Sequence, residues 1–241
     1  MRPSRSGGVR PAEAIILAVV ALLAAAPLLG PLLVIGAHVP RWINEGWNAY
    51  WAEAAIGGGV LYPPFDQMIS NTYTPLSFYI VGLAGRLLGD DIVAGRIIAL
   101  AGLLVVAANI AAIVSRLTGN RFAAWLAALS FVIYAATEAP AYVAMNDPQW
   151  LGLAFSTTGA VVFLARRHAV HGLAWSVGAC VLMLAGGLVK QNLIAWPLAV
   201  LIWTACHERR QLVIWLTVDG IVAAGFCALA AALYGSAFFA A

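Results

Sequence analysis

Residues 42–50 read Trp-Ile-Asn-Glu-Gly-Trp-Asn-Ala-Tyr, and they open a long polar interval, residues 41–91, in a chain that is otherwise apolar. Of the 241 residues, 63% are hydrophobic and only 10% are charged. Soluble domains carry about 25% charged residues, and the continuous apolar runs disfavour a β-barrel, whose strands alternate. The sequence therefore predicts an all-α integral membrane protein.

The apolar runs outside the polar interval predict seven transmembrane helices. A span needs about 20 apolar residues to cross about 30 Å of hydrocarbon. After a short tail, residues 1–11, such runs lie near residues 14–37, 92–115, 122–142, 148–165, 172–189, 191–206 and 211–234. Residues 75–88 are apolar over a shorter stretch, which favours an interfacial helix. We expect a single module with a large first loop, residues 41–91, that contains interfacial helices.

The distribution of basic residues predicts the orientation of the chain. If residues 75–88 do not span, nine of the thirteen Lys and Arg residues share one side, namely residues 2, 5, 10, 116, 121, 166, 167, 209 and 210. The positive-inside rule places that side, with the amino terminus, in the cytoplasm. The first loop, Asp147 and Lys190 then share the external face. The small net charge of +3 gives no reason to expect a nucleic-acid partner.

Glu45 is the first candidate for chemistry, because it follows the first predicted span and lies among aromatic residues. A partly desolvated carboxylate at a membrane edge can act as a general base. Asn44, Trp47 and Tyr50 surround it in sequence, and Tyr73 follows later in the loop, so these residues are expected to line a substrate site. The alternative is a polar helix start within an ordinary aromatic belt.

Asp147 and Lys190 are the candidates outside the first loop. Asp147 precedes Pro148, a pair that is also typical of a helix N-cap. Lys190, followed by Gln191 and Asn192, interrupts a long apolar stretch. A lysine there is costly and suggests a binding site for a phosphate at headgroup level, although a lysine at a helix end can also extend to the interface.

The order of these features resembles the GT-C superfamily of membrane glycosyltransferases, which includes protein O-mannosyltransferases and the aminoarabinose transferases of lipid A. The resemblance covers most of the chain. It rests on short segments in the same order: Asn44-Glu45-Gly46-Trp47-Asn48-Ala49-Tyr50, Gly57-Gly58-Gly59-Val60-Leu61-Tyr62-Pro63, Thr74-Pro75-Leu76-Ser77-Phe78-Tyr79, Gly95-Arg96, Asn146-Asp147-Pro148 and Lys190-Gln191-Asn192.

The resemblance implies an enzyme of the bacterial inner membrane that transfers a sugar from a polyprenyl-phosphate donor to an acceptor at the outer face. It implies Glu45 as general base, Asp147 as a second catalytic acid, and Lys190 with Arg96 near the donor phosphate. Members of the superfamily continue beyond seven spans, so this chain is expected to lack a C-terminal half, or to receive it from a partner chain.

The sequence also bears on an alternative function and on metal binding. The alternative function is a non-catalytic membrane subunit that binds a polyprenyl phosphate or acts as a scaffold. Two external acids are too few to predict a divalent cation, and the histidines are scattered. The sequence therefore predicts no cofactor and no metal site, and it names neither the sugar nor the acceptor.

Overall fold

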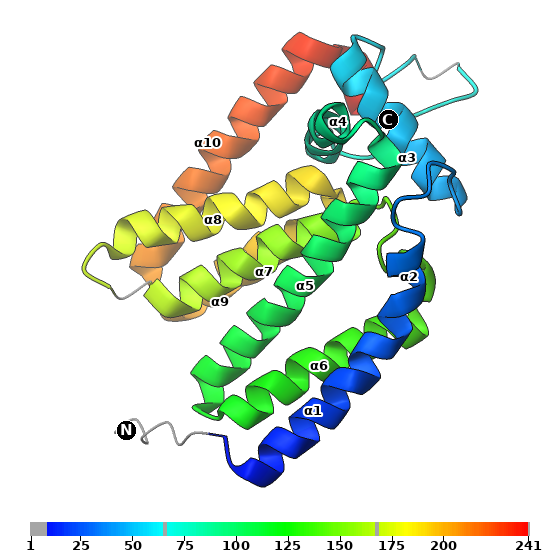
Figure 1. Ribbon diagram of the computed structural model, residues 1–241. Helices are drawn as coiled ribbons and strands as arrows, with labels where there is room; N and C mark the ends of the chain where they lie inside the picture. Colours follow the sequence, from blue (N-terminus) through cyan, green and yellow to red (C-terminus); the bar gives the residue numbers. More distant parts are fainter. Residues whose placement is uncertain (1–8, 65–66, 167–168, 241) are drawn as a thin grey trace.

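The computed structural model describes residues 9–64, 67–166 and 169–240, and every regular element in these ranges is a helix (Figure 1). Four helical segments are long and apolar enough to cross a membrane: Pro11–Leu33, Asp91–Thr118, Gly172–Val189 and Arg209–Tyr234. The prediction of an all-helical fold is confirmed over the described residues, and four helices have the length and apolar composition that a membrane span needs.

In chain order the elements are α1 (Pro11–Ala25), η1 (Ala26–Leu28), α2 (Leu29–Leu33), α3 (Ile43–Gly57), α4 (Leu76–Leu88), α5 (Asp91–Thr118), α6 (Arg121–Glu138), η2 (Pro140–Tyr142), α7 (Gln149–Arg166), α8 (Gly172–Val189), η3 (Gln191–Ile194), α9 (Ala195–His207), α10 (Arg209–Tyr234) and α11 (Ser236–Ala240). The first segment changes to a 3₁₀ turn at η1, which contains Pro27, because proline cannot continue the α-helical hydrogen bonding.

Three of the seven predicted spans, residues 122–142, 148–165 and 191–206, correspond to α6, α7 and α9. These helices are not among the four segments that reach spanning length and hydropathy. With 13 residues, α9 is about 20 Å long, which is shorter than a hydrocarbon core of about 30 Å.

The helices pack around α5, which contacts α3, α4, α6 and α7, while α7 packs closely along α8 (Figure 1). Small residues allow this approach. A Cβ added to Gly159 of α7 would lie 2.7 Å from the carbonyl oxygen of Ala179, and one added to Gly186 of α8 would lie 2.8 Å from that of Gly152. Such small-residue contacts are typical of helices packed in membranes, where burial alone does not drive association.

Helices α3 and α4 lie at one end of the bundle, beside the start of α5 and the end of α10 (Figure 1). We call this region the polar end. Trp51, Tyr62 and Phe78 form a buried cluster there, and the hydroxyl groups of Tyr79 and Tyr234 lie 2.8 Å apart. The prediction of a short helix at residues 75–88 is confirmed by α4, and the first loop also contains α3.

Candidate functional site

Glu45 and Arg96 form a buried ion pair at the polar end. Arg96 Nε donates to Glu45 Oε1 and Arg96 Nη2 donates to Glu45 Oε2, each at 2.8 Å. Each residue is only 1% exposed. The planar guanidinium matches the carboxylate with two parallel hydrogen bonds, an arrangement that lysine could not form. The pair thereby fixes α3 to α5.

The other donors of Arg96 bind backbone carbonyl groups of the turn that follows α2. Nη1 donates to the oxygens of Val34 at 3.0 Å and Ala37 at 2.6 Å, and Nη2 donates to that of Val39 at 3.0 Å. All five guanidinium N–H groups are then used. Arg96 was predicted to help bind a donor phosphate, but in this arrangement it has no donor left for one.

The Glu45 carboxylate is also fully engaged. Its Oε2 accepts the backbone N–H of Arg41 at 2.7 Å, and its Oε1 accepts that of Asn146 at 3.4 Å. Burial raises the pKa of Glu45, but the hydrogen bonds from Arg96 and Arg41 outweigh burial and hold that pKa below its ordinary value. A buried, paired and weakly basic carboxylate accepts a substrate proton poorly. The general-base role predicted for Glu45 therefore finds no support in this geometry.

Asn146 connects this ion pair to the rest of the polar end. Its Nδ2 donates to the carbonyl oxygens of Glu45 and Asp91, at 3.4 and 3.3 Å, and its own carbonyl oxygen accepts from Asn48 Nδ2 at 2.7 Å. Its side chain lies directly against Gly95, where an added Cβ would overlap it. The Gly95-Arg96 pair thus has a physical role: glycine admits Asn146, and arginine binds Glu45.

The turn before Asp147 has an unusual backbone. Ala144 has a φ of 51°, in the left-handed region, which costs a residue other than glycine about 1–2 kcal/mol. Trp150 Nε1 donates to the carbonyl oxygen of Tyr142 at 2.8 Å and closes this turn onto α7. The surrounding hydrogen bonds hold the strained turn in place.

Asp147 and Lys190 form a second ion pair. Lys190 Nζ donates to Asp147 Oδ1 at 3.1 Å, and the same oxygen accepts the backbone N–H of Gln149, the first residue of α7. The predicted capping role of Asp147 is confirmed by this bond. The Lys190 side chain is 15% exposed and that of Asp147 1%. Lys190 Nζ also lies 5.2 Å from the centre of the Tyr73 ring, within the range of a cation–π contact.

A polar cavity of about 350 Å³ lies beside this second pair. Its lining consists of two aromatic rings together with amides, hydroxyls and one aliphatic residue: Ile43, Asn44, Trp47, Asn48, Ser70, Thr72 and Tyr73. Tyr73 and Asn48 connect it to the ion pair, because Lys190 lies over the Tyr73 ring and Asn48 binds the backbone of Asn146. Burial and the nearby charge of Asp147 raise the pKa of Tyr73. Asn48 Oδ1 is buried with no hydrogen-bond partner among the described residues.

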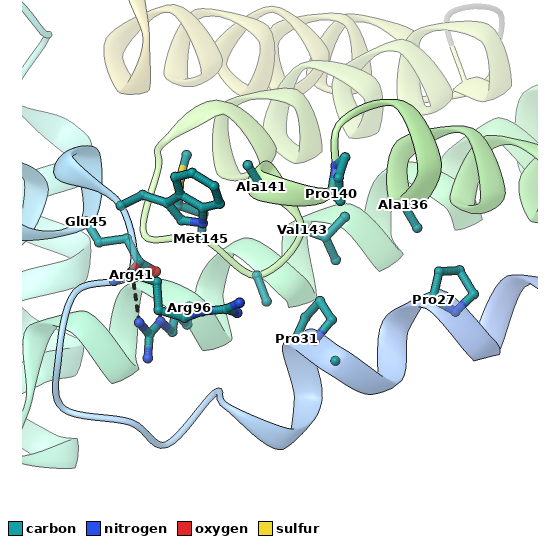
Figure 2. A pocket seen from close by; sticks show the side chains of 13 residues that line it. Pro27, Pro31, Arg41, Glu45, Arg96, Ala136, Pro140, Ala141, Val143 and Met145 are labelled. Atoms are coloured by element: carbon teal, nitrogen blue, oxygen red, sulfur yellow. Dashed lines mark hydrogen bonds and ion pairs between the residues drawn. The ribbon is translucent and has the colours of Figure 1, made fainter.

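A second cavity, of about 230 Å³, lies on the other side of the Glu45–Arg96 pair. Figure 2 shows Pro27 and Pro31 on one wall and Pro140, Val143 and Met145 on the other, with the ion pair at one end. Its walls are mostly apolar, so it offers few groups that could bind a sugar. The polar cavity is therefore the candidate substrate site.

Of the four residues predicted to line a substrate site, the structure brings Asn44, Trp47 and Tyr73 together in the polar cavity. Tyr50 instead lines a separate cavity with Trp51 and Met68.

The residues after Lys190 also have defined places. Gln191 Nε2 donates to the carbonyl oxygen of Thr72 at 2.9 Å, and Thr74 Oγ1 donates to that of Gly187 at 3.2 Å. These bonds attach the loop before α4 to the end of α8. Asn192, predicted beside the phosphate, is exposed in η3.

Sequence reasoning did not single out Asn48 and Asn71, which support the cavity. Asn71 Nδ2 donates to the carbonyl oxygen of Leu61 at 3.3 Å, and Asn71 Oδ1 accepts the backbone N–H of Tyr73 at 3.0 Å. The signal available in the sequence was the density of asparagines in an apolar chain.

Comparison with protein-family models, curated proteins and solved structures finds no match for this chain. Within the described residues, no group of three His, Cys, Asp or Glu side chains could hold a metal ion. The site must therefore be interpreted from its own geometry.

Proposed function

We propose that this chain is a membrane glycosyltransferase module of the GT-C type, which takes a sugar from a polyprenyl-phosphate donor. The observation that carries the proposal is the polar cavity between Trp47 and Tyr73, with the Lys190 ammonium directly over the Tyr73 ring. Aromatic faces, amides and hydroxyls bind the C–H faces and hydroxyl groups of a sugar, and a lysine at the cavity edge binds a phosphate.

The two ion pairs receive different roles in this proposal. Glu45 positions α3 through Arg96 and does not touch substrate, whereas Lys190 leaves Asp147 to bind the donor phosphate. Once Lys190 has left, Asp147 is a carboxylate without a cationic partner, unlike Glu45, and it accepts the proton of the acceptor hydroxyl while the acceptor oxygen attacks the anomeric carbon. The bond from that carbon to the phosphate oxygen breaks, and the polyprenyl phosphate departs with the electron pair, stabilised by Lys190.

The proposal includes the finer topology. Helices α6 and α7 also cross the membrane, as does α9 together with η3, which directly precedes it, and this gives seven spans. The polar end faces outward from a bacterial inner membrane. In support, α6 and α7 each have 18 residues, as many as α8, and both pack along α5. The described arginines of the α5–α6, α7–α8 and α9–α10 turns all lie at the opposite end, as the positive-inside rule requires of a cytoplasmic face.

Donor binding by the purified chain in nanodiscs tests the proposal. The two probes are a polyprenyl-phosphate hexose and the same polyprenyl phosphate without sugar. We expect Trp47→Leu to weaken binding of the hexose donor about tenfold and to leave the sugar-free lipid unchanged, because the ring faces the sugar. The matched control is Trp42→Leu, which changes an exposed tryptophan outside the polar cavity. If the parent binds neither probe, the proposal fails.

The roles of the two acids are separated by donor hydrolysis, with water as the acceptor. We expect Asp147→Asn to abolish hydrolysis while the variant still binds donor. Glu45→Gln should lower the amount of folded protein more than the rate per folded molecule. If Glu45→Gln abolishes hydrolysis and Asp147→Asn does not, Glu45 is the base. If neither change affects hydrolysis, a non-catalytic lipid-binding subunit is favoured.

A further inference from the structure

A large cavity lies at the end of the bundle opposite to the polar end. It has a volume of about 1110 Å³, and its lining residues belong to the start of α8 and the turn from α9 to α10. Figure 1 shows these segments far from α3 and α4. Its lining consists of Ala169, Val170, His171, Gly172, Leu173, Ala174, Val177, Glu208, Arg209, Arg210, Gln211 and Ile214. We call it the basic cavity, because the adjacent residues Arg209 and Arg210 line it.

The two arginines of the basic cavity are exposed and available. Arg209 and Arg210 form no ion pair or side-chain hydrogen bond with any of the residues that the structure describes. Glu208 also lines the cavity, and its side chain is not without a partner. By contrast, Arg116 donates to the carbonyl oxygen of Ala165 at 3.2 Å, and Arg166 lies over the Trp175 ring at 5.5 Å. Two adjacent arginines without a partner among the described residues therefore lie at this one cavity.

The backbone adds to the positive potential. Helices α8 and α10 both begin at the basic cavity, at Gly172 and Arg209, and neither start has a side-chain cap. The first N–H groups of a helix lack partners within the helix and carry partial positive charge. Two helix starts and two guanidinium groups thus point to an anionic ligand.

The surroundings of the basic cavity are apolar. Both α8 and α10 are long and apolar enough to span a membrane, and Val170 and Leu173 in the cavity lining are exposed large hydrophobic residues. A cavity at the ends of two spanning helices lies where lipid headgroups meet water. A soluble anion gains no stabilisation from these apolar side chains, whereas the acyl chains of a lipid can pack against them.

From this combination we infer that the basic cavity binds the phosphodiester headgroup of an anionic phospholipid, whose acyl chains cover the exposed apolar side chains of α8 and α10. Basic pockets between spanning helices bind anionic headgroups in this way. The inference is independent of the proposed sugar transfer, because it concerns the other end of the molecule.

Native mass spectrometry of the full chain, released from nanodiscs of phosphatidylcholine mixed with phosphatidylglycerol, tests this inference. We expect the parent to retain phosphatidylglycerol preferentially, and Arg209→Gln/Arg210→Gln to reduce that preference about 30-fold, which corresponds to about 1 kcal/mol per arginine. The matched control is Arg116→Gln/Arg121→Gln, which removes two charges from the same end outside the basic cavity. Melting temperatures in phosphatidylcholine alone verify that both variants fold.

Three results would overturn the inference. Equal preference in the parent and in Arg209→Gln/Arg210→Gln would show that the cavity does not select the lipid. An equal loss in the control would show a general effect of charge. If inorganic phosphate or an acidic peptide displaces the retained lipid and added phosphatidylglycerol does not, the occupant of the cavity is not an anionic phospholipid.

Discussion

The two ion pairs at the polar end are built from similar groups but differ in almost every physical respect. Glu45 and Arg96 are both buried and share two hydrogen bonds, and Arg96 also binds three carbonyl oxygens. Lys190 and Asp147 share one hydrogen bond, and Lys190 is partly exposed beside a cavity.

The difference shows which charges can leave their partners. Removing Arg96 from Glu45 would strand a buried carboxylate and several carbonyl groups, so this pair belongs to the scaffold. Under the proposed function Lys190 exchanges Asp147 for a donor phosphate, because it makes a single hydrogen bond and its ammonium lies over Tyr73, which lines the polar cavity. The position of a charged residue near the aromatic, polar loop in the sequence does not distinguish a buried structural ion pair from one that can bind a ligand.

The largest effect is expected from Arg96→Met. It leaves Glu45 charged and buried without its partner, which typically lowers the free energy of unfolding by about 3–5 kcal/mol. Denaturant unfolding in detergent measures it. The control is Arg86→Met, because the Arg86–Glu53 pair is exposed at both ends and such pairs contribute less than about 1 kcal/mol. Equal losses in the two variants would contradict the scaffold role.

A smaller loss is expected from Gly95→Ala. The added methyl group overlaps Asn146, and forcing extra volume into a packed site costs about 1–3 kcal/mol. Gly178→Ala in α8 is the matched control, since its Cβ meets no atom within 4 Å and alanine favours a helix by about 0.5–1 kcal/mol. A Gly95→Ala variant as stable as Gly178→Ala would mean that Asn146 is not held as described.

The pH dependence of unfolding should reflect Glu45. Its pKa is lowered in the folded chain, so its contribution is present above the unfolded pKa of about 4.3 and is lost as the pH falls through the folded pKa. Glu45→Gln should be less stable at neutral pH and should lose less stability on acidification.

A residual acid dependence should remain in Glu45→Gln. Burial raises the pKa of Asp90, but bonds from the backbone N–H groups of Val93 and Ile92 and from His38 outweigh burial and lower it. A variant with the same acid profile as the parent would argue against a paired Glu45.

A loss smaller than that of Arg96→Met is expected from Lys190→Met. Asp147 is buried, but it keeps the hydrogen bond from the Gln149 N–H, and Lys190 is 15% exposed, so water can reach the site and the loss should stay below the roughly 3 kcal/mol of a fully buried pair. The methionine chain can still cover Tyr73. Thermal unfolding in nanodiscs is the measurement. A loss as large as that of Arg96→Met would place Lys190 in the scaffold as well.

The helices were accessible to sequence reasoning because continuous apolar runs have few alternatives: residues 172–189 were predicted as a span and form α8. Charge counting also placed Glu45, Asp147 and Lys190 at one end, where the structure brings them into one network. The pairing of Arg96 with Glu45 could not be read in this way. It depends on how α5 packs against the turn after α2, and a buried arginine looks the same in sequence as one that awaits a phosphate.

Binding of a polyprenyl-phosphate hexose to the parent and to Lys190→Met, in nanodiscs of one lipid composition, tests the central claim most directly. We predict at least about tenfold weaker binding, since hydrogen bonds to charged groups contribute about 1.5–3 kcal/mol, with a variant that remains folded at the temperature of the binding measurement. Equal affinity in the two proteins would contradict it, because the donor phosphate would then lie elsewhere.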